Sequence, residues 1–132
     1  MVATTKDRST QQQYAEVISV PVLASAKINA GAMVVATAAG FAAPGSTATT
    51  LSYIGRAEDA VDNTGGANGA KTINVRRKQA FKWVNDGTIT QANLMKIAYI
   101  VDDQTVAATD GTGTRSAAGR IVGVDTDGVW IE

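Results

Sequence analysis

The sequence predicts an all-β fold, a compact antiparallel β-barrel or sandwich of short strands with a flexible N-terminal arm. Three observations predict it. Apolar and polar residues alternate with a period of two in several short runs, and Gly, Asn, Asp and Pro separate these runs. A helical period is hard to find outside one short turn. Short strands spaced by turn signals are typical of antiparallel barrels and sandwiches.

The length and composition predict a single β domain over residues 16–132. A chain of 132 residues fits one domain, and we expect one core that buries roughly two-thirds of the surface of the unfolded chain. Apolar residues make up 45% of the chain but aromatic residues only 5%. The expected core is therefore built from small side chains, which gain less per residue than Leu or Phe, so we expect partner contacts to add to its stability.

The first residues predict an arm over 1–15. Residues 1–13 carry almost no bulky apolar group, so burial cannot offset the entropy of ordering them. Fully extended, the arm spans on the order of 40 Å, enough to reach a neighbouring subunit. A frayed terminus without a role is the alternative. As arm residues that contact a partner we name Thr10, Gln11, Gln12, Gln13 and Tyr14.

Alternation predicts strands in the first half of the chain over 16–23, 32–37 and 51–57. Pro21 cannot donate a ladder hydrogen bond, so the first of these is expected at a sheet edge or a bulge. Further along, residues 62–69 predict an exposed loop because Gly and Asn dominate them. Strands are expected next over 71–78 and 80–84, and Thr90 is suited to cap one helical turn after it.

The last third of the chain has the clearest pattern. Residues 96–106 and 118–132 indicate three or four short strands joined by tight turns. The pair Asp127-Gly128 predicts a type I′ turn, in which both central residues take positive φ. The run 129–131 then returns as a closing strand, so we expect the chain to end inside its own sheet.

Composition argues against several classes of function. Cys and His are absent, which removes thiol nucleophiles, the usual zinc ligands and the commonest general base. Twelve basic residues balance twelve acidic ones, so no net field attracts nucleic acid or an anionic membrane. The polar N-terminus does not resemble a signal peptide, and no apolar run is long enough to cross a bilayer. We expect a protein that is not an enzyme, binds no cofactor or metal, and is synthesised in the cytoplasm.

Three short motifs that could carry chemistry have simpler interpretations. Residues 65–72 approach a phosphate-binding loop, but Ala70 stands where its second glycine is required. Residues 125–128 resemble the start of a calcium loop but lack its later ligands, which favours a hairpin turn. Asp102 and Asp103 are adjacent on a strand and point to opposite faces, so they do not converge as a catalytic pair.

One basic cluster has aromatic neighbours. Arg76, Arg77 and Trp83 combine the residue types found in single-strand nucleic-acid readers and in protein interfaces. Alternation on a strand splits the cations between two faces, so no continuous basic groove is expected. A solvated face beside a buried Phe81 or Trp83 is the simplest interpretation. The functional alternative is contact with a protein partner through these three residues.

The order and spacing of several runs resemble the small capsid decoration, or cement, proteins of tailed bacteriophages. The resemblance spans roughly residues 16–131. It is most specific in the strand that ends Asp-Asp-Gln-Thr-Val106 and the later run Ala-Gly-Arg-Ile-Val-Gly-Val124. The other matching runs are 28–35, 40–45 and 128–131. The match rests on order and spacing, because none of these motifs is diagnostic alone.

The resemblance implies a structural role on the outside of the expanded capsid of a phage. Its partner would be the major capsid protein, with the protein as a homotrimer that fastens neighbouring capsid subunits against internal DNA pressure. The arm would become ordered on the shell. The loop over 62–69 and the basic cluster have no counterpart in the family. The competing class is a carbohydrate- or receptor-binding β module of a virion, for which an exposed Trp83 or Trp130 would be the platform.

Overall fold

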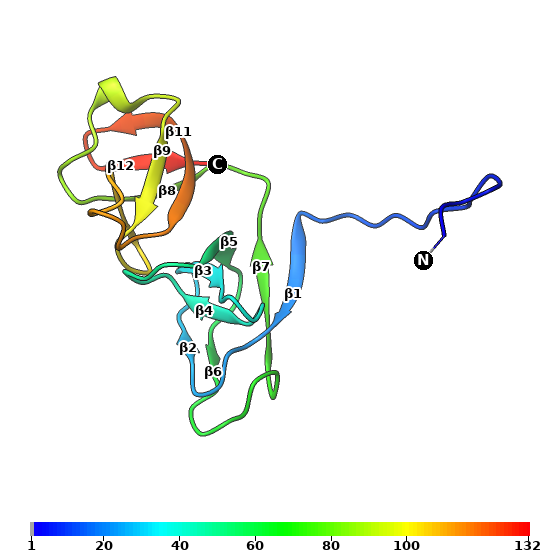
Figure 1. Cartoon of the computed structure of the whole chain (residues 1–132). Coiled ribbons are helices and arrows are strands. Elements are labelled where there is room, and N and C mark those ends of the chain that lie inside the picture. The colour runs from blue at the N-terminus through cyan, green and yellow to red at the C-terminus, as the bar shows by residue number, and fades with distance from the viewer. Residues whose placement is uncertain (1) are drawn as a thin grey trace.

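The computed structural model describes residues 2–132, and Met1 of the predicted arm lies outside them. Over these residues the fold is all-β, which confirms the predicted fold class. Figure 1 shows a barrel, a twisted sheet beside it and a long N-terminal extension. The strands are β1 Val17–Pro21, β2 Lys27–Ile28, β3 Met33–Ala36, β4 Ala42–Pro44, β5 Ser52–Ala57, β6 Val61–Asp62, β7 Thr72–Arg76, β8 Phe81–Asn85, β9 Ile97–Ile100, β10 Thr105–Ala107, β11 Ala117–Asp125 and β12 Gly128–Ile131.

The strands form three groups. A five-stranded sheet has the order β1-β7-β5-β3-β4, a closed barrel has the order β10-β8-β12-β11-β9, and β2 pairs with β6 alone. All named pairs are antiparallel except β10 and β8, which run parallel. Strand β1 lies at an edge of the sheet and ends at Pro21, as that proline predicted. Thr90 precedes a single 3-10 turn, Gln91–Asn93, where a helical turn was expected.

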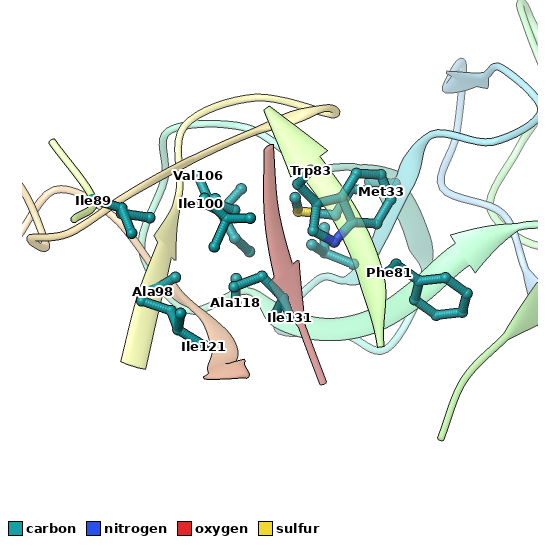
Figure 2. Packing of buried hydrophobic residues seen from close by; sticks show 13 residues of the cluster. Met33, Phe81, Trp83, Ile89, Ala98, Ile100, Val106, Ala118, Ile121 and Ile131 are labelled. Carbon is teal, nitrogen blue, oxygen red and sulfur yellow. The ribbon is translucent and has the colours of Figure 1, made fainter. Parts of the chain in front are cut away.

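Two cores replace the one core that the length suggested. The larger one, here called the barrel core, fills the barrel and extends onto the adjacent face of the sheet (Figure 2). Its buried members are Met33, Val35, Ala43, Phe81, Trp83, Ile89, Ala98, Ile100, Val106, Ala118, Ile121, Val129 and Ile131. The smaller one, the sheet core, consists of Val20, Val22, Ile28, Ala32, Val34, Ala42, Ala57, Ile73 and Val75.

Strand β3 explains why two cores form. Successive side chains of a strand point to opposite faces, so Met33 and Val35 enter the barrel core while Val34 enters the sheet core. All three side chains are fully buried. The sheet is therefore covered on both faces at this strand. The prediction of one domain over 16–132 is compatible with this shared strand and stays a prediction.

The C-terminal strands match the expected pattern. Strands β9, β10, β11 and β12 account for the four short strands, with a turn over 101–104 between the first two. Strand β12 pairs with β11 on one side and β8 on the other. The chain therefore ends inside its own sheet, as expected.

The prediction of a type I′ turn with Asp127-Gly128 at its centre is wrong, both in position, by one residue, and in turn type. Asp125 pairs with Gly128, so Thr126 and Asp127 are the central residues of the turn, and neither has positive φ. Gly128 is needed for a different reason. A Cβ atom at this position would lie 2.8 Å from Cγ of Lys82, so the glycine makes room for that side chain.

The predicted exposed loop over 62–69 is partly wrong as well. Asp62 belongs to β6, and Asn63 is only 1% exposed. The Nδ2 atom of Asn63 donates hydrogen bonds to the carbonyl oxygens of Leu23 and Ala67, at 3.0 and 3.1 Å. The buried amide of Asn63 thus holds in place a loop whose Gly and Asn content predicted full exposure.

The substitution Ile121→Ala should destabilise the fold by about 2–5 kcal/mol, because it leaves a cavity in the barrel core where this side chain is fully buried. Urea unfolding would measure the change. Val84→Ala is the control, since Val84 is 46% exposed and its truncation should stay within about 0.5 kcal/mol. Equal losses for both variants would contradict the assignment of Ile121 to the core.

Candidate functional site: the N-terminal arm and its base

The N-terminal arm projects away from the rest of the protein (Figure 1). Every residue from 2 to 14 is exposed and none belongs to a strand. Tyr14 is 91% exposed at the end nearest the sheet. The one hydrogen bond within residues 2–14 joins the Arg8 guanidinium to the Thr10 hydroxyl at 3.2 Å. The backbone groups of the arm are therefore free to pair with another molecule.

The predicted arm contacts all lie in this segment. Thr10, Gln11, Gln12, Gln13 and Tyr14 are exposed and consecutive. Alternate side chains of an extended segment point to opposite sides, and its backbone can pair along both edges. The geometry allows a contact with a partner, and the contact itself stays a prediction.

The base of the arm is held by Arg77. Its guanidinium Nη1 donates a hydrogen bond to the carbonyl oxygen of Ala15 at 3.1 Å. Its backbone N–H donates to the carbonyl oxygen of Glu16 at 2.8 Å. The ladder between β1 and β7 then begins at Val17, opposite Arg76. This role of Arg77 has no signal in the sequence, because 62 positions separate Arg77 from Ala15.

Arg76 is engaged by a carboxylate of the same sheet. Its Nε lies 2.9 Å from Oε1 of Glu58, and Nη2 of Arg56 lies 2.7 Å from the same oxygen. The hydrogen bonds from Arg76 and then Arg56 lower the pKa of Glu58 below its ordinary value. The Arg56 guanidinium also lies over the Phe81 ring, 5.1 Å from its centroid. Arg76 and Arg77 are both engaged by groups of the same chain, and their contact with a protein partner stays a prediction.

Trp83 is a correction to the predicted surface contacts. Its side chain is in the barrel core and only 5% exposed. Figure 2 shows the indole ring among the other core residues. Its Nε1–H donates a hydrogen bond to the Tyr53 hydroxyl at 3.1 Å, and burial raises the pKa of Tyr53 to about 12. Its place on β8 made it inward-facing, so it supports the fold rather than a surface.

Trp130 is the more exposed of the two tryptophans, at 37%. Its Nε1–H donates to a carboxylate oxygen of Asp125 at 2.8 Å. Lys82 completes the cluster, with its Nζ 2.5 Å from Oδ1 of Asp127 and 5.8 Å from the centroid of the Trp130 ring. The hydrogen bond with Asp127 raises the pKa of Lys82, and the one from Trp130 lowers the pKa of Asp125. The Trp130 ring is therefore half-exposed and held in place by the charged side chains of Asp125 and Lys82.

The described residues hold no cluster of three or more carboxylates that could bind a metal ion. Within residues 2–132 there is also no helix with the length and apolar character needed to cross a membrane. Comparisons with protein-family models, with curated proteins and with solved structures found no match.

Acid should weaken the fold through Glu58. Its folded-state pKa is lowered, so the stability it contributes is fully present above its ordinary value of 4.5 and is lost as pH falls through the lowered pKa. Urea midpoints measured from neutral pH downward should therefore fall less steeply below pH 4.5 in Glu58→Gln than in the unmodified chain. Identical acid dependence in both chains would contradict the interaction.

Tyr53 should ionise late in alkaline solution, because burial raises its pKa to about 12. An ultraviolet absorbance titration of the folded protein would resolve this step, and Tyr53→Phe should remove it. Persistence of the late step in Tyr53→Phe would assign it to another group and contradict the burial of this hydroxyl.

Proposed function

We propose that this chain is a structural virion protein that binds the outer surface of the expanded capsid of a tailed phage and cements its major capsid subunits. In this role it stabilises the head against internal DNA pressure. The resemblance described from the sequence motivates the proposal. The observation that carries it is the arm, whose residues 2–14 are exposed, belong to no strand and project away from the body.

The arm supports an attachment role for a physical reason. An extended segment with unpaired backbone groups gains hydrogen bonds when a partner strand or groove accepts it. The body needs no catalytic group for such a role, because it has only to fold, present the arm and pack against the shell. A protein that binds only the expanded shell stabilises that state by linkage, and many copies on one lattice add up to a large effect.

The proposal includes the partners that the resemblance implies. The major capsid protein is the binding partner, and the protein is a homotrimer on the capsid exterior. The protein is synthesised in the cytoplasm of the bacterial host, has no enzymatic activity, uses no cofactor and contacts neither nucleic acid nor membrane. A contact that buries roughly 1,600 Å² would suffice for stable attachment.

A carbohydrate- or receptor-binding module is the second candidate. Trp130 favours it, because a half-exposed indole beside Asp125 could stack against a sugar ring. A glycan screen followed by tryptophan fluorescence would test this candidate, and Trp130→Ala would serve as the variant that loses the response. Trp83 no longer supports it, since that ring is buried.

Co-sedimentation with capsids of the source phage that lack this protein tests the proposal. We expect saturation at a stoichiometry set by the capsid lattice on expanded shells, and no binding to unexpanded procapsids. Absence of binding to expanded shells would overturn the proposal.

Removal of residues 2–13 should leave the urea midpoint unchanged, because these residues make no contact with either core. The same deletion should weaken attachment to expanded shells. Trypsin offers a second measurement, since Lys6 and Arg8 are exposed in the free arm and should be protected on the shell. Unchanged attachment of the truncated chain would remove the arm from the mechanism.

A further inference from the structure

Arg77 holds two consecutive carbonyl groups at the point where the arm leaves the sheet. Its guanidinium donates to the oxygen of Ala15 and its own N–H donates to the oxygen of Glu16. Ala15 is the first of residues 2–132 that is not exposed. One residue of the neighbouring strand therefore defines where the free arm begins.

The position of β1 in the sheet makes the contact between Arg77 and Ala15 important for the direction in which the arm leaves the body. Strand β1 is an edge strand that pairs with β7 alone in its sheet, and its ladder with β7 begins at Val17. The end of an edge strand frays easily, because it is supported on one side only. The backbone N–H of Arg77 extends the support to Glu16, and its side chain extends it further to Ala15, toward the arm.

We propose that Arg77 is a positioning residue for attachment, which fixes the direction in which the arm leaves the body. The inference rests on the proposed function and gives Arg77 a role other than the direct partner contact expected from the sequence. A segment whose exit is already fixed loses less conformational freedom when a partner binds it, so it binds more tightly.

The chemistry of arginine suits this role. A guanidinium is a charged donor, and a hydrogen bond from a charged donor is stronger than one between neutral groups. Its acceptor is a backbone carbonyl, so the contact does not depend on the side chain at position 15. Residues 77–80 also form the connection from β7 to β8, so Arg77 links the arm to the segment that leads into the barrel.

The absence of Cys in the sequence allows two spin labels to be placed without removing native thiols. One label replaces exposed Gln13 in the arm and the other replaces exposed Gln104, directly before β10 of the barrel. Pulsed electron paramagnetic resonance on the free protein then measures the distribution of distances between them. We expect Arg77→Met to broaden this distribution relative to the chain that retains Arg77.

Arg120→Met is the matched control. The Arg120 guanidinium donates the same kind of hydrogen bond to a backbone carbonyl, that of Met95, at 2.6 Å in the barrel. This control should leave the distribution unchanged. Arg77→Leu, which also lacks a donor, provides a second variant should Arg77→Met fold poorly, and it should also broaden the distribution. An unchanged distribution in the folded Arg77 variants overturns the proposal.

Attachment of unlabelled chains to expanded shells separates this inference from the proposed function. We expect about tenfold weaker attachment for Arg77→Met, because roughly one more backbone residue of the arm must then be ordered on binding. A broadened distribution with unchanged attachment would overturn the role of Arg77 in binding. Failure of the unmodified chain to attach would overturn the proposed function instead, while the free-state distribution would still report whether Arg77 directs the arm.

Discussion

The burial of β3 on both faces is the constraint on which the rest of the structure depends. Met33 and Val35 pack into the barrel core and Val34 into the sheet core, so this one strand joins the two cores. The N–H of Met33 also donates to the carbonyl of Asp103 in the turn between β9 and β10, at 2.7 Å. Substitution of β3 by polar residues would therefore expose apolar surface on both sides.

The barrel and the sheet meet in a seam of close contacts around this strand. The Ser116 hydroxyl, in a residue only 8% exposed, accepts a hydrogen bond from the N–H of Leu51 and donates one to the carbonyl of Ala48. At Gly45 a Cβ atom would lie 2.9 Å from the carbonyl oxygen of Asp102, so only glycine permits this approach. These contacts hold the sheet against the barrel. The strand order then places β1, and with it the arm, three strands away from β3.

The sequence contained most of the local structure and little of the long-range structure. Alternation located the longer strands but missed the short β2, β4 and β6. Pro21 indicated an edge strand because a proline has no N–H for the ladder. The pair Asp127-Gly128 misled because glycine serves close packing against Lys82 there as well as it would serve a turn. The division into two cores depends on which strands become neighbours, and local patterns do not encode that.

The candidate site also contains one part that the sequence predicted and one part that it did not. The exposed arm could be predicted, because a segment without bulky apolar residues has nothing to bury. The contact between Arg77 and Ala15 could not, since it joins positions that only the pairing of β1 with β7 brings together. The basic cluster could be recognised in the sequence. The ion pair between Arg76 and Glu58 could not, because it depends on the pairing of β5 with β7.

Electron cryomicroscopy of expanded shells reconstituted with this protein tests the central claim most directly. The proposed role predicts lattice-ordered density for the body on the capsid exterior, with residues 2–14 ordered against the major capsid protein and leaving the body beside Arg77. Bodies attached through another surface, with the arm free in solvent, would contradict it.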